Sequence, residues 1–401
     1  MTKQALYKDT DKKKKIKYID SIRGLAATFI MLGHFYYGFF ADPSIINENV
    51  QVFSFYTTSH NLFYFLFNGT FCVSVFCVLS GWFTKPAKTF KELLFNIFKR
   101  WLRLAIPLTI LLICVFALSC FNLFRWGEEF SQMAGGTWIL FKSNTFSLFD
   151  ALFNGLIGVL FLGRSSFSSQ LWMLRPLFFG QILLLLFFFF ERIPKKTIRY
   201  ILQCLIILFS FAWSYPCFAV SLGGVLKKAF EKRNFDSLMS KSGQIIVILA
   251  ALLILIIGHK KVFLFLPTIE IVGHSLDIYE RIQTLMAVMF VFCIFVSKNI
   301  QRVLNNSAVY IFGQASMAIY LIHVPIFMSV SPMLLMLFLQ NSSYAISYLF
   351  TEIISISIVI LLSAIWHFSV DKVTTLATKT IDKKISPLLN RNFLSKKEKD
   401  C

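Results

Sequence analysis

Long apolar runs dominate this chain and constrain its fold more than any other feature. Ten runs follow one another, at 19–41, 61–84, 104–124, 171–190, 198–214, 216–226, 244–258, 282–297, 308–330 and 345–368. Most have the roughly 20 residues that cross a hydrocarbon core of about 30 Å. The hydrophobic share of the 401 residues is 57%, above the roughly 45–50% of soluble domains. The pattern predicts an all-α polytopic membrane bundle of about ten transmembrane helices, in which the short run 216–226 is kept because the topology needs it.

The basic residues are spread unevenly over this pattern. Of 40 Lys and Arg residues, one lies within a predicted span, Arg175, and only six lie in predicted non-cytoplasmic loops: Arg125, Lys142, Arg164, Lys260, Lys261 and Arg281. The positive-inside rule therefore places both termini in the cytoplasm. The net charge of +20 is explained by this topology and by contact with anionic membrane lipids, so we predict no nucleic-acid partner.

The chain is predicted to be one membrane domain, 19–370, between two cytoplasmic basic tails, 1–18 and 371–401, that we expect to be disordered. The apolar stretch 146–162 would invert every later loop if it crossed the membrane, so we interpret it as interfacial or re-entrant. The eight cysteines have no metal-type spacing, and we predict no metal site.

The first run carries ionisable residues where they are costly. Arg23 and His34 are eleven positions apart, close to three helical turns, and Asp20 falls near the same face. Arg23 and His34 are separated by about 16 Å along the helix axis. This places Arg23 at the cytoplasmic mouth and His34 near the middle of the bilayer. The spacing alone leaves open a snorkelling arginine and a histidine that is hydrogen-bonded to a neighbouring helix.

Four further sequence blocks accompany this one. They are "VSVFCVLSGWF" (73–83), "KRWLRLAIPL" (99–108), "SSQLWMLRPLFF" (168–179) and "AIYLIHVPIF" (318–327). Together with "YIDSIRGLAATFIMLGHF" (18–35) they resemble, in order, the motifs of membrane acyltransferase family 3, integral enzymes typified by polysaccharide O-acetyltransferases. Two positions depart from the family pattern: Ser74 replaces an acidic residue, and Arg175 stands after Leu-Trp-x-Leu where some members carry an acidic residue.

The resemblance implies a set of site residues. His34 and Asp20 are expected to serve catalysis, and Arg23, Arg100, Arg103 and Ser80 to bind acyl-CoA, with acetyl-CoA as the expected donor. Tyr320 and His323 are expected to line the acceptor side. Trp172 and Arg175 are also assigned there, although the residues leave open an interfacial belt position for Trp172 and pairing with an acidic group for Arg175. Independent interpretations stay open: Arg100 and Arg103 also suit a cytoplasmic loop, Ser80 and Gly81 also suit close helix packing, and Tyr320 with His323 also suits an interhelical hydrogen bond.

The expected function follows from the resemblance: an O-acetyltransferase of a bacterial inner membrane that moves an acyl group from cytosolic acyl-CoA to a hydroxyl of an extracytoplasmic or lipid-linked glycan. The alternative is an exporter or flippase for such a glycan, which consumes no acyl-CoA. A non-catalytic receptor would leave the five ordered blocks unexplained. The sequence leaves open the acceptor, the acyl chain length, direct transfer or an acyl-histidine intermediate, and monomer or homodimer.

Overall fold

The structure is a computed structural model. It describes residues 17–39, 68–133, 147–165, 167–232, 235, 238, 240–258, 266–271 and 274–397. The predicted amino-terminal tail lies outside these residues except for its last two positions.

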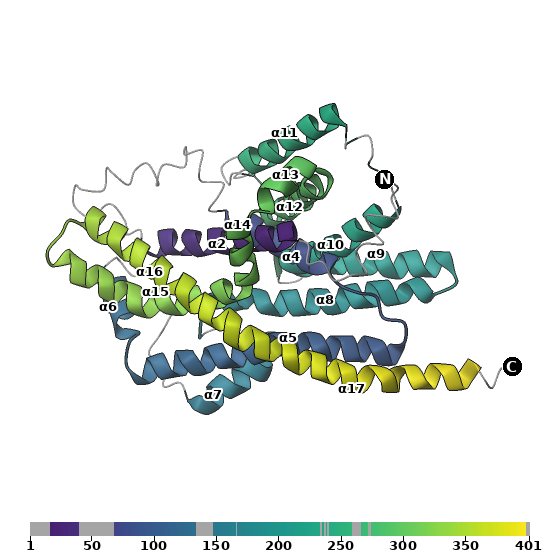
Figure 1. Ribbon diagram of the computed structural model, residues 1–401, viewed down its shortest axis with the longest axis horizontal. Helices are drawn as coiled ribbons and strands as arrows, with labels where there is room; N and C mark the ends of the chain where they lie inside the picture. The colour runs from purple at the N-terminus through teal and green to yellow at the C-terminus, as the bar shows by residue number, and fades with distance from the viewer. Residues whose placement is uncertain are drawn as a thin grey trace.

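Helices make up nearly all of the described structure (Figure 1). Those that coincide with the ten predicted spans are α2 (Lys17–Phe39), α4 (Gly69–Trp82), α5 (Phe90–Cys120), α8 (Leu174–Phe189), α9 (Lys196–Trp213), α10 (Tyr215–Lys232), α11 (Lys241–Ile257), α12 (Ile278–Val296), α15 (Ser316–Leu339) and α16 (Tyr344–Trp366). The connecting helices are α6 (Arg125–Met133), α7 (Leu148–Phe153), α13 (Lys298–Leu304), α14 (Ser307–Gln314), α17 (Lys372–Lys397), the π-helices η4 (Asn154–Leu162) and η9 (His367–Asp371), and the 3₁₀ turns η5 (Ser169–Met173) and η6 (Phe190–Arg192).

Six continuous helical stretches in the described residues are long and apolar enough to cross a membrane. They are Phe90–Cys120, Ser169–Arg192, Lys196–Trp213, Ile278–Val296, Ser316–Leu339 and Tyr344–Ile385. The outer faces of these helices are apolar: on α9, Leu205, Leu208 and Phe209 are each more than half exposed. Contiguous apolar surface of this extent marks a membrane-facing surface, so the chain is an integral membrane protein. The count of about ten spans and the cytoplasmic placement of both termini stay predictions.

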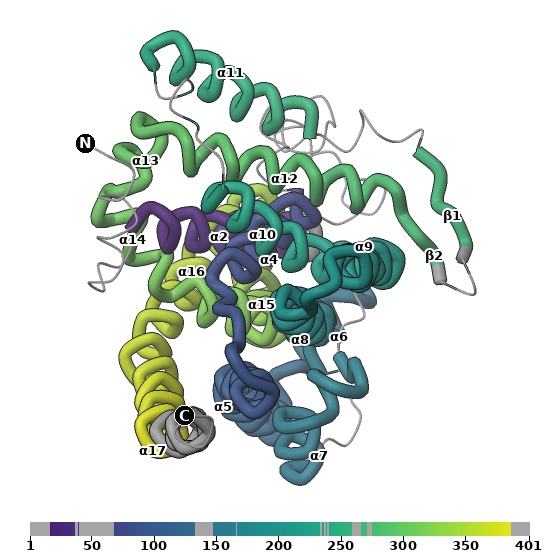
Figure 2. Tube along the Cα trace, turned by 90° about the vertical axis from the view of Figure 1, so that its right-hand side faces the viewer, coloured from purple at the N-terminus to yellow at the C-terminus, as the bar shows by residue number. Residues whose placement is uncertain are grey.

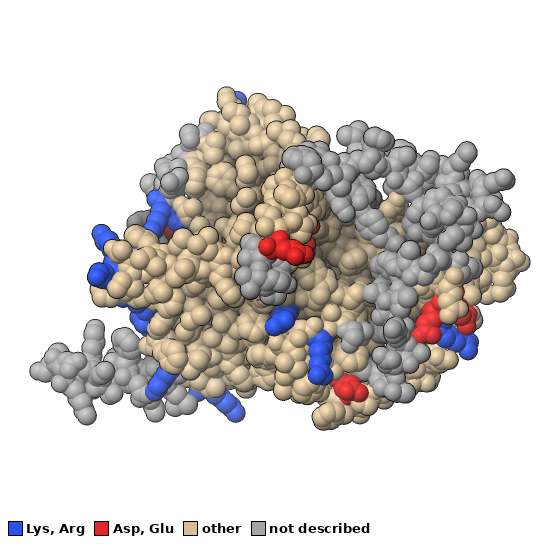
Figure 3. All heavy atoms as spheres, turned by 180° about the vertical axis from the view of Figure 1, so that it is seen from behind, with Lys and Arg blue, Asp and Glu red and all other residues tan. Residues whose placement is uncertain are grey.

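The helices run in two main directions. Helices α5, α8 and α9 appear lengthwise in Figure 1 and end-on in Figure 2, whereas α12 runs across them in Figure 2. The α8–α9 turn and the carboxyl end of α17 lie at one end of the molecule, and the α15–α16 turn lies at the other (Figure 1). Most of the Lys and Arg side chains visible in Figure 3 gather at the first end. That end carries loops that the sequence predicts to be cytoplasmic.

Two glycine contacts bring α2 and α4 against their neighbours. A Cβ on Gly313 of α14 would lie 2.2 Å from the carbonyl oxygen of Asp20, and one on Gly24 would lie 2.3 Å from the amide nitrogen of Gly313. A Cβ on Gly81 of α4 would lie 2.0 Å from the carbonyl oxygen of Val220 of α10. Small residues permit such close backbone approach between apolar helices. They hold α14 and α10 directly beside the segments that carry the candidate site.

The structure corrects the predicted fold in three places. The all-α prediction misses an antiparallel hairpin of β1 (Thr268–Ile271) and β2 (His274–Asp277). The predicted single span 308–330 is divided at Ala315 into α14 and α15. The predicted disorder of 371–401 is wrong for α17, which continues α16 through η9 and packs along α5, where Lys99 Nζ lies 3.0 Å from Asp382 Oδ1.

The ambiguous stretch 146–162 forms a short helical unit of six α-helical and nine π-helical residues, α7 and η4. It packs against α5, where the Trp101 indole donates a hydrogen bond to the Leu156 carbonyl over 2.9 Å. This is shorter than the roughly 20 residues of a spanning helix, which agrees with the interfacial or re-entrant interpretation.

Candidate active site

His34 of α2 and His323 of α15 lie side by side in the bundle. The distance from His34 Nδ1 to His323 Nε2 is 2.8 Å, and the ring centroids are 5.1 Å apart. His323 is fully buried, and its Nδ1 lies 2.9 Å from the Ile319 carbonyl oxygen. The sequence predicts both histidines as site residues but places them in different roles. The structure joins them into one pair.

The hydrogen bonds of the pair fix its tautomers. A carbonyl oxygen only accepts, so His323 Nδ1 must donate to Ile319 and His323 Nε2 must be the acceptor of the pair. His34 Nδ1 then donates, which leaves the lone pair on His34 Nε2. An imidazole with this lone pair is suited to act as a base or nucleophile. His323 would share the positive charge that His34 gains when it takes up a proton.

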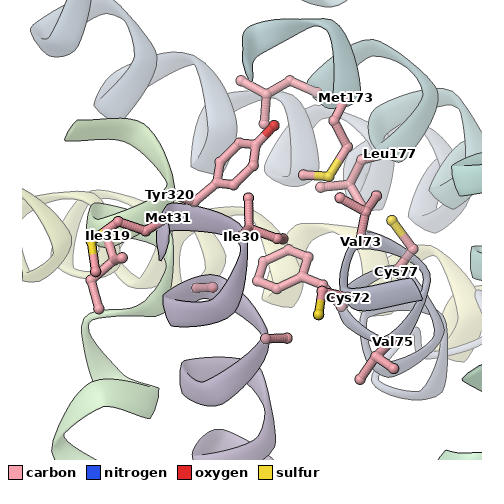
Figure 4. Close-up of a cluster of buried hydrophobic side chains, with 14 of the residues drawn as sticks. Ile30, Met31, Cys72, Val73, Val75, Cys77, Met173, Leu177, Ile319 and Tyr320 are labelled. Carbon is pink, nitrogen blue, oxygen red and sulfur yellow. The ribbon is translucent and has the colours of Figure 1, made fainter. Parts of the chain in front are cut away.

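Tyr320 and Gln170 tie this pair to the Leu-Trp-x-Leu block. The Tyr320 hydroxyl donates to the Gln170 carbonyl, and the Gln170 side-chain amide donates to the Leu321 carbonyl over 2.9 Å. Figure 4 shows Tyr320 pointing from α15 toward the segment that carries Met173 and Leu177, above Ile30 of α2. Two motifs about 150 residues apart in the sequence therefore form one buried joint. The Tyr320 hydroxyl is bound to the backbone there.

Arg23 lies about three turns before His34 on α2. Its Nη1 lies 3.9 Å from Asp20 Oδ1, and its Cζ lies 5.1 Å from the centroid of the Phe76 ring of α4. The Phe76 ring in turn stacks on Tyr320 with a centroid distance of 6.5 Å. A continuous column of side chains thus links Arg23 to the histidine-bearing face of α15. Asp20, predicted as catalytic, lies beside Arg23 rather than beside the histidines.

The predicted arginine cluster is assembled around Arg23. Arg103 acts electrostatically on both Arg23 and Arg100, so the three guanidinium groups share one region at the start of the membrane part of α5. Three cations so close together repel one another unless anions lie among them. Such a cluster fits a polyanionic ligand such as a phosphate ester.

Asp371 supplies negative charge to this cluster and was missed by the sequence analysis. It interacts electrostatically with Arg23 and Arg103, and its Oδ2 lies 3.2 Å from Nδ1 of His367 four residues earlier. Both residues lie in the π-helical turn η9, and such turns occur frequently at functional sites. The spacing of four in "HFSVD" signals a shared helix face, but only the fold shows what this face meets.

Ser80 and Gly81 serve helix packing in this structure. The Ser80 hydroxyl accepts a hydrogen bond from the Gln181 side-chain amide of α8, and Gly81 contacts the α10 backbone. The two residues therefore hold α4 against α8 and α10. The predicted contact of Ser80 with acyl-CoA stays a prediction.

Trp172 lies in η5, directly before α8, and Arg175 lies in the first turn of α8. The Trp172 side chain is 42% exposed, and its ring centroid lies 5.8 Å from that of Tyr215. Arg175 Cζ lies 5.8 Å from the centroid of Trp213 and 6.0 Å from that of Phe179. No contact of Arg175 with either histidine is seen among the described residues, and its predicted place on the acceptor side stays a prediction.

A buried histidine pair and an arginine cluster carried by apolar helices form the layout expected of a membrane enzyme that acts on an anionic substrate. A family model described as an acyltransferase domain, that of acyltransferase family 3, matches residues 16–366. The chain belongs to this family of membrane acyltransferases. No curated protein and no solved structure matches the chain. The match ends just before η9, so His367, Asp371 and α17 lie beyond it.

Proposed function

We propose that the protein transfers an acyl group, with acetyl as the favoured one, from acyl-CoA to a hydroxyl of an extracytoplasmic or lipid-linked glycan. The proposal rests above all on the 2.8 Å contact between His34 and His323 and on the tautomer that it sets. The family match supports acyl transfer in general. The donor and the acceptor are our inference from the arginine cluster and from the motifs.

The geometry suggests a simple course for the reaction. The acceptor hydroxyl gives its proton to His34 Nε2 while its oxygen attacks the thioester carbonyl carbon. The charge on His34 is shared with His323 through the Nδ1 contact. When the intermediate collapses, the C–S bond breaks and the proton on His34 passes to the departing CoA sulfur. The products are an ester and CoA thiol, and the histidine pair returns to its starting state.

The arginine cluster accounts for the donor. CoA carries several phosphate groups, and guanidinium groups bind phosphate through paired, charge-assisted hydrogen bonds. Arg23 stands eleven residues from His34 on one helix, about 16 Å along the axis. A phosphate held at Arg23, Arg100 and Arg103 would leave the thin pantetheine arm to extend toward His34. Export without acyl transfer would give this arrangement no role.

The test uses purified protein in lipid nanodiscs and acetyl-CoA labelled on the acetyl carbon. Thiol release and protein-bound label are followed for the parent protein, for His34→Ala and for His34→Gln. The matched control is His274→Gln, which changes a histidine on the β2 strand. We expect turnover in the parent and the control and none in either His34 variant. Full turnover in a folded His34 variant, or none in the parent with candidate glycans present, would reject the proposal.

A further inference from the structure

Arg175 has no acidic partner among the described residues. Its Nε is shut off from solvent and has no hydrogen-bond partner. Among the described residues no carboxylate lies within ion-pair distance of it, although Arg23, Lys99, Lys228 and Arg281 each have one. A charged side chain in an apolar span without a counter-charge is costly. Arg175 also lies in the first turn of α8, near the positive pole of the helix dipole, which raises this cost further.

Two aromatic rings and a glycine turn surround the guanidinium group of Arg175. The rings of Phe179 and Trp213 lie 5.7 Å apart at nearly a right angle, and the guanidinium carbon lies within 6.0 Å of both centroids. α8 and α9, which carry these rings, run side by side (Figures 1 and 2). On the opposite side the chain turns through Gly163, whose φ is 72°. A Cβ at that position would lie 2.9 Å from Arg175 Nη1, so glycine leaves the room that the guanidinium occupies.

Arg175 is adjacent to an exposed apolar segment and to the segment that contacts α15. Just before Gly163, η4 presents Phe161 and Leu162, which are 40% and 52% exposed on the apolar surface. On the other side, Gln170 is bound to the Tyr320 and Leu321 backbone region beside His323. Arg175 follows Gln170 by five residues, about 8 Å along a helix. Arg175 thus contacts the turn that follows an exposed apolar segment, and it shares the start of α8 with the segment that is bound to α15.

We propose that Arg175 binds the phosphate of a lipid-linked acceptor, so that the lipid chain lies along η4 while the attached sugar reaches the histidine pair. This rests on the proposed acyl transfer and narrows its acceptor to a phosphate-bearing, lipid-linked glycan. Guanidinium binds phosphate by paired charged hydrogen bonds, and the aromatic rings hold it in place from behind. The acceptor phosphate supplies the counter-charge that the described residues do not.

The first test measures binding without catalysis. The protein is placed in phosphatidylcholine nanodiscs, a polyprenyl monophosphate is titrated in, and the fluorescence of the tryptophans is followed, since Trp213 lies against Arg175. Arg175→Gln removes the charge. Arg164→Gln is the matched control. Arg164 directly follows Gly163 in the sequence, but it interacts electrostatically with Asp150, and its Cζ lies 5.5 Å from the centroid of the Phe153 ring. Phosphatidylglycerol, at the same mole fraction, replaces the polyprenyl phosphate in a second arm.

We expect saturable binding of the polyprenyl phosphate that weakens by about tenfold or more in Arg175→Gln, as for the loss of a charged hydrogen bond, and that stays unchanged in Arg164→Gln. Equal binding by the parent protein and Arg175→Gln would overturn the proposal. An equal fluorescence change with phosphatidylglycerol would overturn it too, because Arg175 would then bind any anionic headgroup.

A second test separates this inference from the proposed reaction. Acetyl transfer is compared between a polyprenyl-phosphate-linked sugar and the same sugar on an uncharged alkyl chain. We expect the parent protein to have a lower KM for the phosphate-bearing acceptor than for the uncharged one. In Arg175→Gln the two KM values should become equal, while the rate of acetyl-CoA consumption at saturating acceptor stays the same. If the parent acetylates both acceptors with the same KM, the phosphate site is rejected and the proposed acyl transfer is retained. Arg175-dependent binding without any transfer supports the site and rejects the reaction.

Discussion

His323 offers the sharpest test of the histidine pair because it touches His34 from a buried position. Its Nε2 accepts from His34 Nδ1 over 2.8 Å, and its side chain has no exposed surface. Replacing it with leucine keeps a side chain of similar volume between Phe327 and Tyr320 but removes the acceptor. His34 then loses both its fixed tautomer and the group that shares its charge.

The size of the effect follows from that single hydrogen bond. A hydrogen bond to a group that becomes charged is worth about 1.5–3 kcal/mol, and about 1.4 kcal/mol corresponds to tenfold in rate. His323→Leu should therefore lower kcat by about 10- to 150-fold. The KM for acyl-CoA should not change, since the arginine cluster lies around Arg23, eleven residues from His34 on α2. His323→Gln, whose amide oxygen lies close to the position of Nε2, should recover part of the loss.

The assay is steady-state release of CoA thiol by protein in nanodiscs, with thermal unfolding measured on each variant to confirm the fold. If folded His323→Leu keeps kcat within about threefold of the parent, the hydrogen bond does not support catalysis, and the reasoning from the tautomer fails. A rise in KM with unchanged kcat would also contradict it, because His323 would then serve binding.

The other predictions concern the arginine cluster and the packing of α14. Arg103→Gln should raise the KM for acyl-CoA by about tenfold, the loss of one charged contact with phosphate, and steady-state kinetics in low salt would show it. Asp371→Asn should lower this KM several-fold because the Asp371 carboxylate competes with phosphate for the arginines. Asp382→Asn, which removes a carboxylate from α17, should leave the KM unchanged. Equal effects of the two substitutions would refute competition. Gly313→Ala should destabilise the protein by about 1–3 kcal/mol, since its methyl group would lie 2.2 Å from an α2 carbonyl, and Gly69→Ala, with nothing within 4 Å, should leave the unfolding temperature unchanged.

The sequence predicted much of the helical fold because apolar run length carries that information directly. Each of the ten runs coincides with a helix, and the face shared by Arg23 and Asp20 is present as an ion pair. Breaks and extensions were harder to predict. Ala315 divides one apolar run although it is neither glycine nor proline, and α17 is a polar helix that gains its partner only when α5 lies beside it.

The site was predicted in its parts and not in its connections. Motif spacing found His34, His323 and the arginines, but a contact across 289 positions leaves no periodic signal in one sequence. Gln170 escaped notice because its role is to bind the backbone of α15, which no local pattern reveals. Asp371 lies beyond the family match, and its carboxylate meets the arginines only because η9 continues α16.

We propose that the donor binds at Arg23 and that the acyl group is transferred at His34, about three turns further along α2. The test measures acetyl-CoA affinity by calorimetry and turnover by thiol release on the same preparation of His34→Gln. We expect affinity equal to that of the parent protein and turnover reduced to background. Turnover at the parent level, or loss of affinity together with turnover in a protein that remains folded, would contradict it.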